Sequence, residues 1–301
     1  MDNTIRIGTR NSRLAMIQTE MVAASLREAA PGIEISLEAR QTTGDKILNK
    51  PLQEFGGKGV FVSEFEEGIL AGRLDLAVHS AKDMPMDLAQ GLSIVGVPPR
   101  EDPRDVLVTA AGRPFPESGE IVIGTSSPRR KLQIELLGKE LWPDGTVRCE
   151  NLRGNVQTRL GKLEDGGYDG IILAAAGLKR LGLLEDARYC YQFLECQRFI
   201  PAGGQGILAV EGRADSRAAE ILRGINHRET QLCLDLERRV LRLLEAGCHE
   251  PIGVYARLSG GLLEVFGISG KNGRVYKIHL KGQQEEAGEL ARRAAEGLGG
   301  V

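Results

Sequence analysis

The chain has 301 residues, of which 42% are hydrophobic and 27% are charged, and its formal net charge is −2. This composition is typical of a globular protein of two or three domains. A pI near 6.2 argues against a nucleic-acid-binding protein, whose domains are usually strongly basic. Residues 1–6 lack the apolar core of a secretory signal, and the longest apolar run, residues 171–178, is too short for a membrane helix. We therefore expect a cytoplasmic protein with no membrane partner.

The cysteines do not form a recognisable framework. Their odd number and the absence of CxxC spacing argue against both a disulfide network and a zinc site. Four histidines also lack metal-ligand spacing, so we expect no metal. The five cysteines are Cys149, Cys190, Cys196, Cys233 and Cys248.

The first two thirds of the chain alternate between short apolar segments and helical patterns. The expected strands are residues 4–8, 33–39, 74–78, 92–97, 105–109, 121–124, 146–150 and 170–174. The expected helices are residues 12–30, 62–72, 128–139 and 155–164. This alternation predicts two α/β domains with mostly parallel sheets, in which ligands bind beyond the carboxyl ends of the strands.

The last third has a different pattern. Helices are expected at residues 216–225, 229–246 and 285–296, and strands at residues 253–258, 262–268 and 275–280. Gly-Gly and Asn-Gly pairs separate these strands, which favours tight turns between antiparallel neighbours. We expect a small α+β domain with a three-stranded antiparallel sheet.

Basic residues follow several expected strands at the point where a helix begins. In Gly-Thr-Ser-Ser-Pro-Arg-Arg (residues 124–130), Ser127 can cap a helix that starts at Pro128. Arg129 and Arg130 then oppose the helix dipole, where a sequence selected for stability alone would place acids. The free N–H groups of such a helix start attract carboxylates or phosphates. The alternative is a solvated helix start with surface arginines.

The same arrangement occurs twice more. Arg153 precedes Gly154 and the potential cap Asn155, with Arg159 one turn later, and Arg10 precedes Asn11 and Ser12. The planar guanidinium group matches carboxylates in two-point contacts. Cations gathered at corners of a nearly neutral chain therefore indicate a focused anion site.

Two further segments add charged residues. The loop Gly-Gly-Lys-Gly around Lys58 lacks P-loop spacing and is expected to be a lid over an anionic ligand. Lys82 and Asp83 follow a buried strand and could form a surface ion pair of little energetic value. Alternatively, Asp83 is an anion that stabilises a cationic intermediate.

Cys248 lies in Gly-Cys-His-Glu-Pro after the long amphipathic helix. Adjacent Cys and His side chains usually diverge, which is poor geometry for a nucleophile and its base. The residue chemistry leaves a buried structural thiol and a covalent attachment point as alternatives.

Together these motifs resemble the hydroxymethylbilane synthase family, also called porphobilinogen deaminase. The resemblance runs from Arg6 to about Ala256. It is carried by RIGTRNSRLA, GGKGVFVSE, DLAVHSAKDMP, EDPRD, GTSSPRR, LRGNVQTRL, IILAAAGLKRLG, PAGGQG and EAGCHEPIG.

The resemblance implies three domains. Two resemble type II periplasmic binding proteins, with the active site in the cleft between them. Domain 1 would comprise residues 1–98 and 200–215, domain 2 residues 99–199, and domain 3, the α+β domain, residues 216–301.

The implied transferase joins four porphobilinogen molecules head to tail, with release of ammonia, into linear hydroxymethylbilane. Growth starts from a covalent dipyrromethane cofactor, whose thioether falls on Cys248, and Asp83 stabilises the azafulvenium intermediate. The resemblance also implies a monomer that passes its product to the next tetrapyrrole-pathway enzyme. The implied cofactor-binding residues are Ser12, Lys82, Thr125, Ser127, Arg129, Arg130, Arg153 and Gln205. The implied substrate-binding residues are Arg10, Lys58, Arg153, Arg159 and Arg180.

Two other functions compete with this one. A non-catalytic anion-binding protein would explain the α/β halves and the arginines, but not Asp83 or Cys248. A hydrolase using Cys248 would need a base that no motif supplies.

Overall fold

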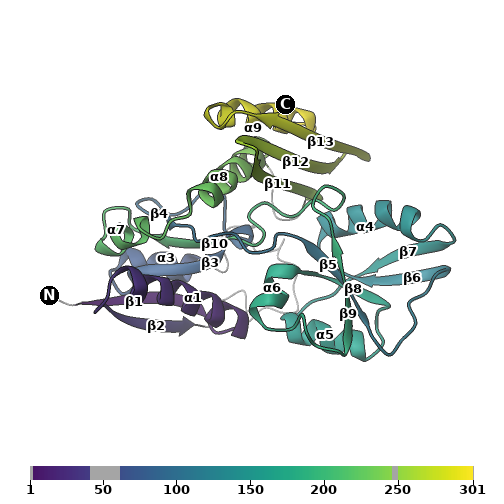
Figure 1. Cartoon of the computed structure of the whole chain (residues 1–301), viewed down its shortest axis with the longest axis horizontal. Helices are drawn as coiled ribbons and strands as arrows, with labels where there is room; N and C mark the ends of the chain where they lie inside the picture. The colour runs from purple at the N-terminus through teal and green to yellow at the C-terminus, as the bar shows by residue number, and fades with distance from the viewer. Residues whose placement is uncertain (1–2, 41–61, 246–249, 301) are drawn as a thin grey trace. The chain divides into compact units, whose positions relative to one another are not determined.

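The computed structural model describes residues 3–40, 62–245 and 250–300 (Figure 1). The chain divides into two compact units. Unit 1 contains Met1–Glu101 and Ile207–Leu234, and unit 2 contains Asp102–Gly206 and Asp235–Val301. The chain thus leaves unit 1 and later returns to it. The finer division into three domains stays a prediction.

Unit 1 is built on a five-stranded sheet of order β2-β1-β3-β10-β4. Its strands are β1 (Thr4–Arg10), β2 (Glu34–Arg40), β3 (Leu76–Ser80), β4 (Ser93–Gly96) and β10 (Leu208–Gly212). β1 is parallel to β2 and β3, whereas β10 is antiparallel to both of its neighbours. The short 3-10 helix η2 (Ala81–Asp83) directly follows β3.

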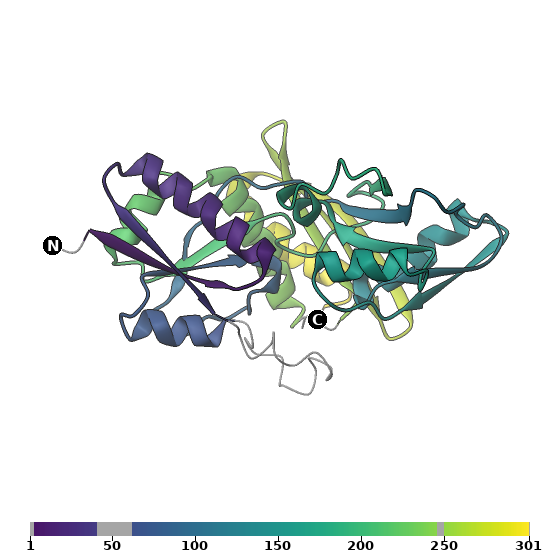
Figure 2. The same cartoon turned by 90° about the horizontal axis from the view of Figure 1, so that it is seen from below.

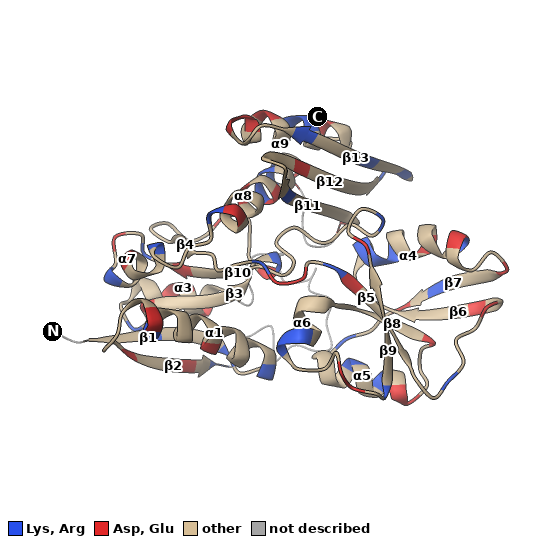
Figure 3. Cartoon of the chain, viewed as in Figure 1, with Lys and Arg blue, Asp and Glu red and all other residues tan. Residues whose placement is uncertain are grey.

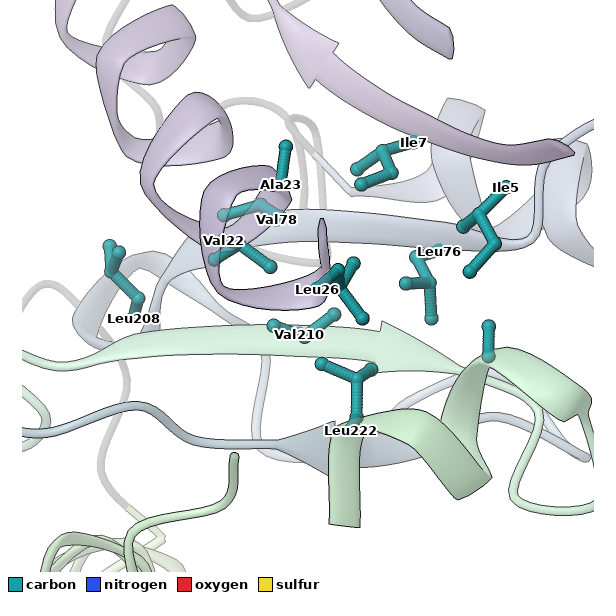
Figure 4. Packing of buried hydrophobic residues seen from close by; sticks show 11 residues of the cluster. Ile5, Ile7, Val22, Ala23, Leu26, Leu76, Val78, Leu208, Val210 and Leu222 are labelled. Carbon is teal, nitrogen blue, oxygen red and sulfur yellow. The ribbon is translucent and has the colours of Figure 1, made fainter. Parts of the chain in front are cut away.

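Helices cover both faces of this sheet. α1 (Arg13–Ala29) and α7 (Arg217–Arg223) pack on one face, and α3 (Ser63–Leu70) packs on the other (Figure 2). Alternate strand residues point to opposite faces, so Ile7, Val78 and Val210 meet Leu26 of α1 (Figure 4). Ala77, from the intervening position of β3, meets the α3 face instead.

The first part of unit 2 contains a second five-stranded sheet, of order β7-β6-β8-β5-β9. Its strands are β5 (Asp105–Ala110), β6 (Gly119–Gly124), β7 (Gly145–Glu150), β8 (Gly170–Ala174) and β9 (Tyr189–Leu194). β6 is parallel to β7 and β8, and β5 is antiparallel to β8 and β9. The accompanying helices are α4 (Pro128–Leu141), α5 (Val156–Glu164) and α6 (Ala175–Arg180).

The remainder of the chain begins with α8 (Arg228–Leu243), which runs from unit 1 into unit 2. It is followed by β11 (Ile252–Ser259), β12 (Leu262–Lys271) and β13 (Arg274–Gly282), which form an antiparallel sheet. The 3-10 helix η3 (Gln284–Glu286) and α9 (Ala287–Gly297) complete the described chain.

The expected fold class is confirmed: two α/β sheets precede a three-stranded antiparallel sheet. The prediction of mostly parallel sheets was wrong, because β10 and β5 run antiparallel to their neighbours and make each large sheet mixed. The sequence analysis did not anticipate β9, β10 or α6. No helix among the described residues is long and apolar enough to span a bilayer.

Candidate active site

The start of α4 has the predicted capping geometry. Ser127 is the N-cap residue, its Oγ accepts a hydrogen bond from the N–H of Arg130 at 3.4 Å, and Pro128 occupies the first turn. Thr125 is buried, and its Oγ1 accepts from the N–H of Ser127 at 3.2 Å. The turn between β6 and α4 is therefore held by its own hydroxyl groups.

Arg129 and Arg130 are buried and share one carboxylate. They are only 4% and 7% exposed, which excludes the alternative of surface arginines. Arg129 Nη1 lies 2.7 Å from Asp105 Oδ2, and Arg130 donates to Oδ1 through Nε at 3.0 Å and Nη2 at 2.7 Å. Backbone carbonyls accept two further bonds: Ile200 O from Arg129 and Ile172 O from Arg130.

This cluster of Arg129, Arg130 and Asp105 is not electrically balanced. Two cations surround a single carboxylate whose residue is 0% exposed, which leaves one positive charge in excess. Burial lowers the pKa of Arg129, against the opposing effect of Asp105. The buried Arg129 Nε has no hydrogen-bond partner among the described residues. An unpaired buried charge is costly, so the cluster suits one additional anion.

The segment 200–206 is fixed against this cluster from several sides. Gln133 of α4 forms a two-point contact with the backbone of Ile200, accepting at 2.6 Å and donating at 2.9 Å. Gln205 is 1% exposed and donates to Pro103 O at 2.8 Å. Arg180 Nη2 donates to Gly206 O at 2.8 Å. Gln205 and Arg180, both predicted to bind ligand, thus donate to backbone carbonyls at Pro103 and Gly206.

Glu237 of α8 joins the same segment to the C-terminal sheet. Its carboxylate is fully buried and accepts from the N–H groups of Gly204 at 2.6 Å and Ala256 at 2.7 Å. The close approach of β11 to this segment requires glycine at position 253, since a Cβ there would lie 2.7 Å from Ile200 O.

Arg153 and Arg159 lie at the next corner. Gly154 has φ +115°, a conformation that glycine adopts readily, and Asn155 caps α5 by accepting from Thr158 N at 2.9 Å. Arg159 Nε donates to Gly154 O at 2.8 Å, while Arg153 is exposed.

The corners of unit 2 meet at one edge of the sheet. Because β7 and β8 are both parallel to β6, their carboxyl ends lie at the same edge. The loops and helix starts that follow therefore carry the predicted basic residues together, and Figure 3 shows basic residues at the start of α4 and on α6.

Unit 1 presents a corresponding edge. β1 and β3 are parallel, and Arg10 ends β1 while Lys82 and Asp83 follow β3. Ser12 caps α1 by accepting from Ala15 N at 3.3 Å. Asp83 is exposed, and Lys82 and Arg10 are partly buried. These four residues are brought to one edge, as the sequence predicted.

Lys58 and Cys248 lie outside the described residues. Sequence analysis missed Asp105, Gln133 and Glu237. The signal for the latter two was a polar residue within the buried stripe of a helix, whereas Asp105 stands in the EDPRD segment without any local sign of its partners.

Comparison with known families decides the identity of the chain. The family model for the porphobilinogen deaminase dipyrromethane cofactor-binding domain matches residues 5–220, and the model for the porphobilinogen deaminase C-terminal domain matches residues 231–299. The chain belongs to the porphobilinogen deaminase family. It therefore contains the cofactor-binding domain of this family and has its function in tetrapyrrole biosynthesis, with porphobilinogen as the small-molecule substrate.

Curated relatives agree along the whole chain. Porphobilinogen deaminase from Syntrophobacter fumaroxidans is 45% identical over 271 residues, covering 89% of this chain and 84% of that protein. The enzymes from Alkaliphilus metalliredigens and Roseiflexus castenholzii are each 42% identical, covering 98% and 99% of this chain and 92% and 96% of those proteins.

Similar solved structures are more distant. The periplasmic aliphatic sulphonate-binding protein SsuA from Escherichia coli is 14% identical with a TM-score of 0.41, covering 80% of this chain and 70% of that chain. A molybdenum transporter substrate-binding domain from Clostridium difficile is 10% identical with a TM-score of 0.41, covering 76% and 94%.

Proposed function

We propose that the protein condenses four porphobilinogen molecules on a dipyrromethane primer, with the residue roles that the family resemblance implies. In each round the C–N bond of the aminomethyl group breaks, and ammonia leaves. A C–C bond then forms to the free pyrrole carbon of the growing chain, which loses its proton.

The observation that carries this proposal is the buried cluster of Arg129, Arg130 and Asp105. Its excess positive charge and the unpartnered Arg129 Nε fit a ligand that carries carboxylates. The acetate and propionate groups of the cofactor supply such anions, and paired guanidinium groups are suited to them. When bound, the cofactor supplies the pyrrole end to which the first substrate is joined.

The remaining cations provide carboxylate contacts as the chain lengthens. We assign Arg153, Arg159 and Arg180 to substrate in unit 2, and Arg10 in unit 1. Ser12, Lys82, Thr125, Ser127 and Gln205 contribute further contacts to the cofactor, and Lys58 contacts substrate. Each porphobilinogen adds two carboxylates, so repeated condensation demands this many cations.

Asp83 has the opposite charge. Its position after β3, next to Lys82, puts a carboxylate at the edge that carries Arg10. We assign it to stabilise the azafulvenium cation and the pyrrole N–H groups, because a fixed anion lowers the energy of a developing positive charge.

Cys248 is assigned as the thioether attachment residue by its match to the family motif. We further propose a monomer located in the cytoplasm, which passes hydroxymethylbilane to the next enzyme of the pathway.

Incubation of purified protein with porphobilinogen tests the proposal. We expect four porphobilinogen consumed and four ammonia released for each hydroxymethylbilane. An anion-binding protein would bind porphobilinogen without releasing ammonia, and that result would refute the catalytic proposal. A hydrolase thiol at Cys248 would be alkylated in the native protein, whereas a thioether sulfur would not.

A further inference from the structure

On the α3 side of its sheet, unit 1 brings together three ionisable side chains that the proposed reaction does not use. Glu211 of β10 is 0% exposed, His79 of β3 is 8% exposed, and Glu66 of α3 is partly buried. His79 and Glu211 point to this face because the alternate residues Val78 and Val210 point to the α1 face. None of the three residues has a role in the reaction proposed above.

One oxygen of Glu211 has a partner and the other does not. Glu211 Oε2 lies 3.0 Å from His79 Nε2, whose ring also contacts Phe65 edge-on. Glu211 Oε1 is buried and has no hydrogen-bond partner among the described protein donors. A carboxylate oxygen left unpaired in this environment is costly, so a donor is required.

Glu66 can supply this donor when its carboxyl group is protonated. Glu66 belongs to α3, the helix on this face, and interacts with Glu211, while its Oε1 accepts from Ala89 N at 2.8 Å. Two adjacent ionised carboxylates would repel each other, but one retained proton converts the repulsion into a hydrogen bond. The pKa of Glu66 is raised by burial first and by the neighbouring Glu211 carboxylate next, with Ala89 and His79 acting in the opposite direction.

Among the described residues, the charged groups on the neighbouring elements are acids or are bound elsewhere. Within the described chain, β4 has no ionisable residue, and β1 directs Arg6 to this face, where it is bound to Asp75. Glu64 and Glu67 on α3 itself are acids.

We propose that Glu66, Glu211 and His79 form a proton-sharing network in which Glu66 donates its proton to Glu211 and so positions the strand end that carries Asp83. The link is short. β10 pairs with β3 up to Ser80, and Ala81 N then donates to Ile207 O at 3.0 Å immediately before Lys82 and Asp83. The positioning role rests on the function proposed for Asp83.

The replacement Glu66→Gln separates this network from a simple buried ion pair. The amide donates to Glu211 and accepts from Ala89 N, as the protonated acid does, but cannot titrate. The pKa of the Glu66 carboxyl group is raised in the folded protein. The stability that this group contributes is therefore fully present below its unfolded-state pKa and is lost as pH rises through its folded-state pKa. The variant should therefore match the wild type at pH 4 and have a higher Tm at pH 8.

Thermal unfolding from pH 4 to 9 measures this difference. Glu67→Gln is the matched control, because Glu67 is exposed on the same helix, and its Tm should track the wild type at every pH. A Glu66→Gln Tm that is lower at pH 8, or that parallels the wild type throughout, would overturn the shared proton.

Kinetics test the positioning role. Glu211→Gln should lower kcat by about tenfold, equivalent to roughly 1.4 kcal/mol, with little change in KM, whereas Glu66→Gln should retain kcat. Unchanged kcat in Glu211→Gln would overturn the positioning role. A wild type that releases no ammonia from porphobilinogen would refute the proposed function and with it this role, while the Tm measurements would still decide the proton sharing.

Discussion

Replacing Asp105 by Asn should destabilise unit 2 strongly. The carboxylate makes three short contacts, at 2.7, 2.7 and 3.0 Å, to two buried arginines. The amide keeps only one acceptor oxygen, turns its NH2 group towards guanidinium donors and raises the buried charge of the cluster from +1 to +2. Removing one partner of a buried ion pair typically costs about 3–5 kcal/mol. For a unit of this size, that corresponds to a Tm lower by roughly 6–20 °C.

Thermal unfolding followed by circular dichroism measures this effect, with Asp102→Asn as the control. Asp102 also binds an arginine, Arg104, but both side chains are partly exposed, at 21% and 34%. Its replacement should cost about 1 kcal/mol or less. The mass of each denatured variant then reports cofactor loading, which should fall for Asp105→Asn and persist for Asp102→Asn. Equal stability of the two variants would refute the reasoning that Asp105 holds the arginine pair.

The other predictions concern catalysis, packing and thiol chemistry. Asp83→Asn, or more strongly Asp83→Ala, should nearly abolish ammonia release while the protein stays folded and keeps its cofactor; surviving turnover would disprove the electrostatic role. Replacing Arg129 or Arg130 by Leu should block cofactor assembly, and a normal cofactor spectrum would contradict this. Glu237→Gln should cost about 1–3 kcal/mol in urea unfolding, since one of two backbone N–H groups loses its acceptor; an unchanged midpoint would show that the contact is dispensable. Burial raises the pKa of the Cys149 thiol to about 11, so iodoacetamide at pH 7.5 should label exposed Cys190 first, as peptide mapping would reveal, and preferential labelling of Cys149 would contradict its burial.

Local features of this fold could be predicted from the sequence because they depend on adjacent residues. The caps at Ser12, Ser127 and Asn155 each form a hydrogen bond to a backbone N–H three residues ahead. The turns of the antiparallel sheet follow from Gly-Gly and Asn-Gly pairs in the same way. Such features are determined within one helical turn or one hairpin.

Features that depend on the return of the chain could not be predicted in this way. β10 is buried throughout, so it lacks the alternation that marks a half-exposed strand. Its antiparallel place between β3 and β4 is set by residues more than 100 positions away.

The partners of the site residues also could not be predicted from local sequence. The sequence marked Arg129 and Arg130 as unusual, but their shared partner Asp105 lies on β5, 24 and 25 residues earlier, and emerges only once the sheet has formed. Glu211 likewise meets His79 across 132 residues.

The intact mass of the denatured protein tests the central claim most directly. We predict an excess that corresponds to two linked pyrrole units, which disappears in Cys248→Ala. Unmodified protein should gain pyrrole units on incubation with porphobilinogen. A mass that equals the bare chain and stays unchanged after that incubation would contradict the covalent cofactor and the proposed function together.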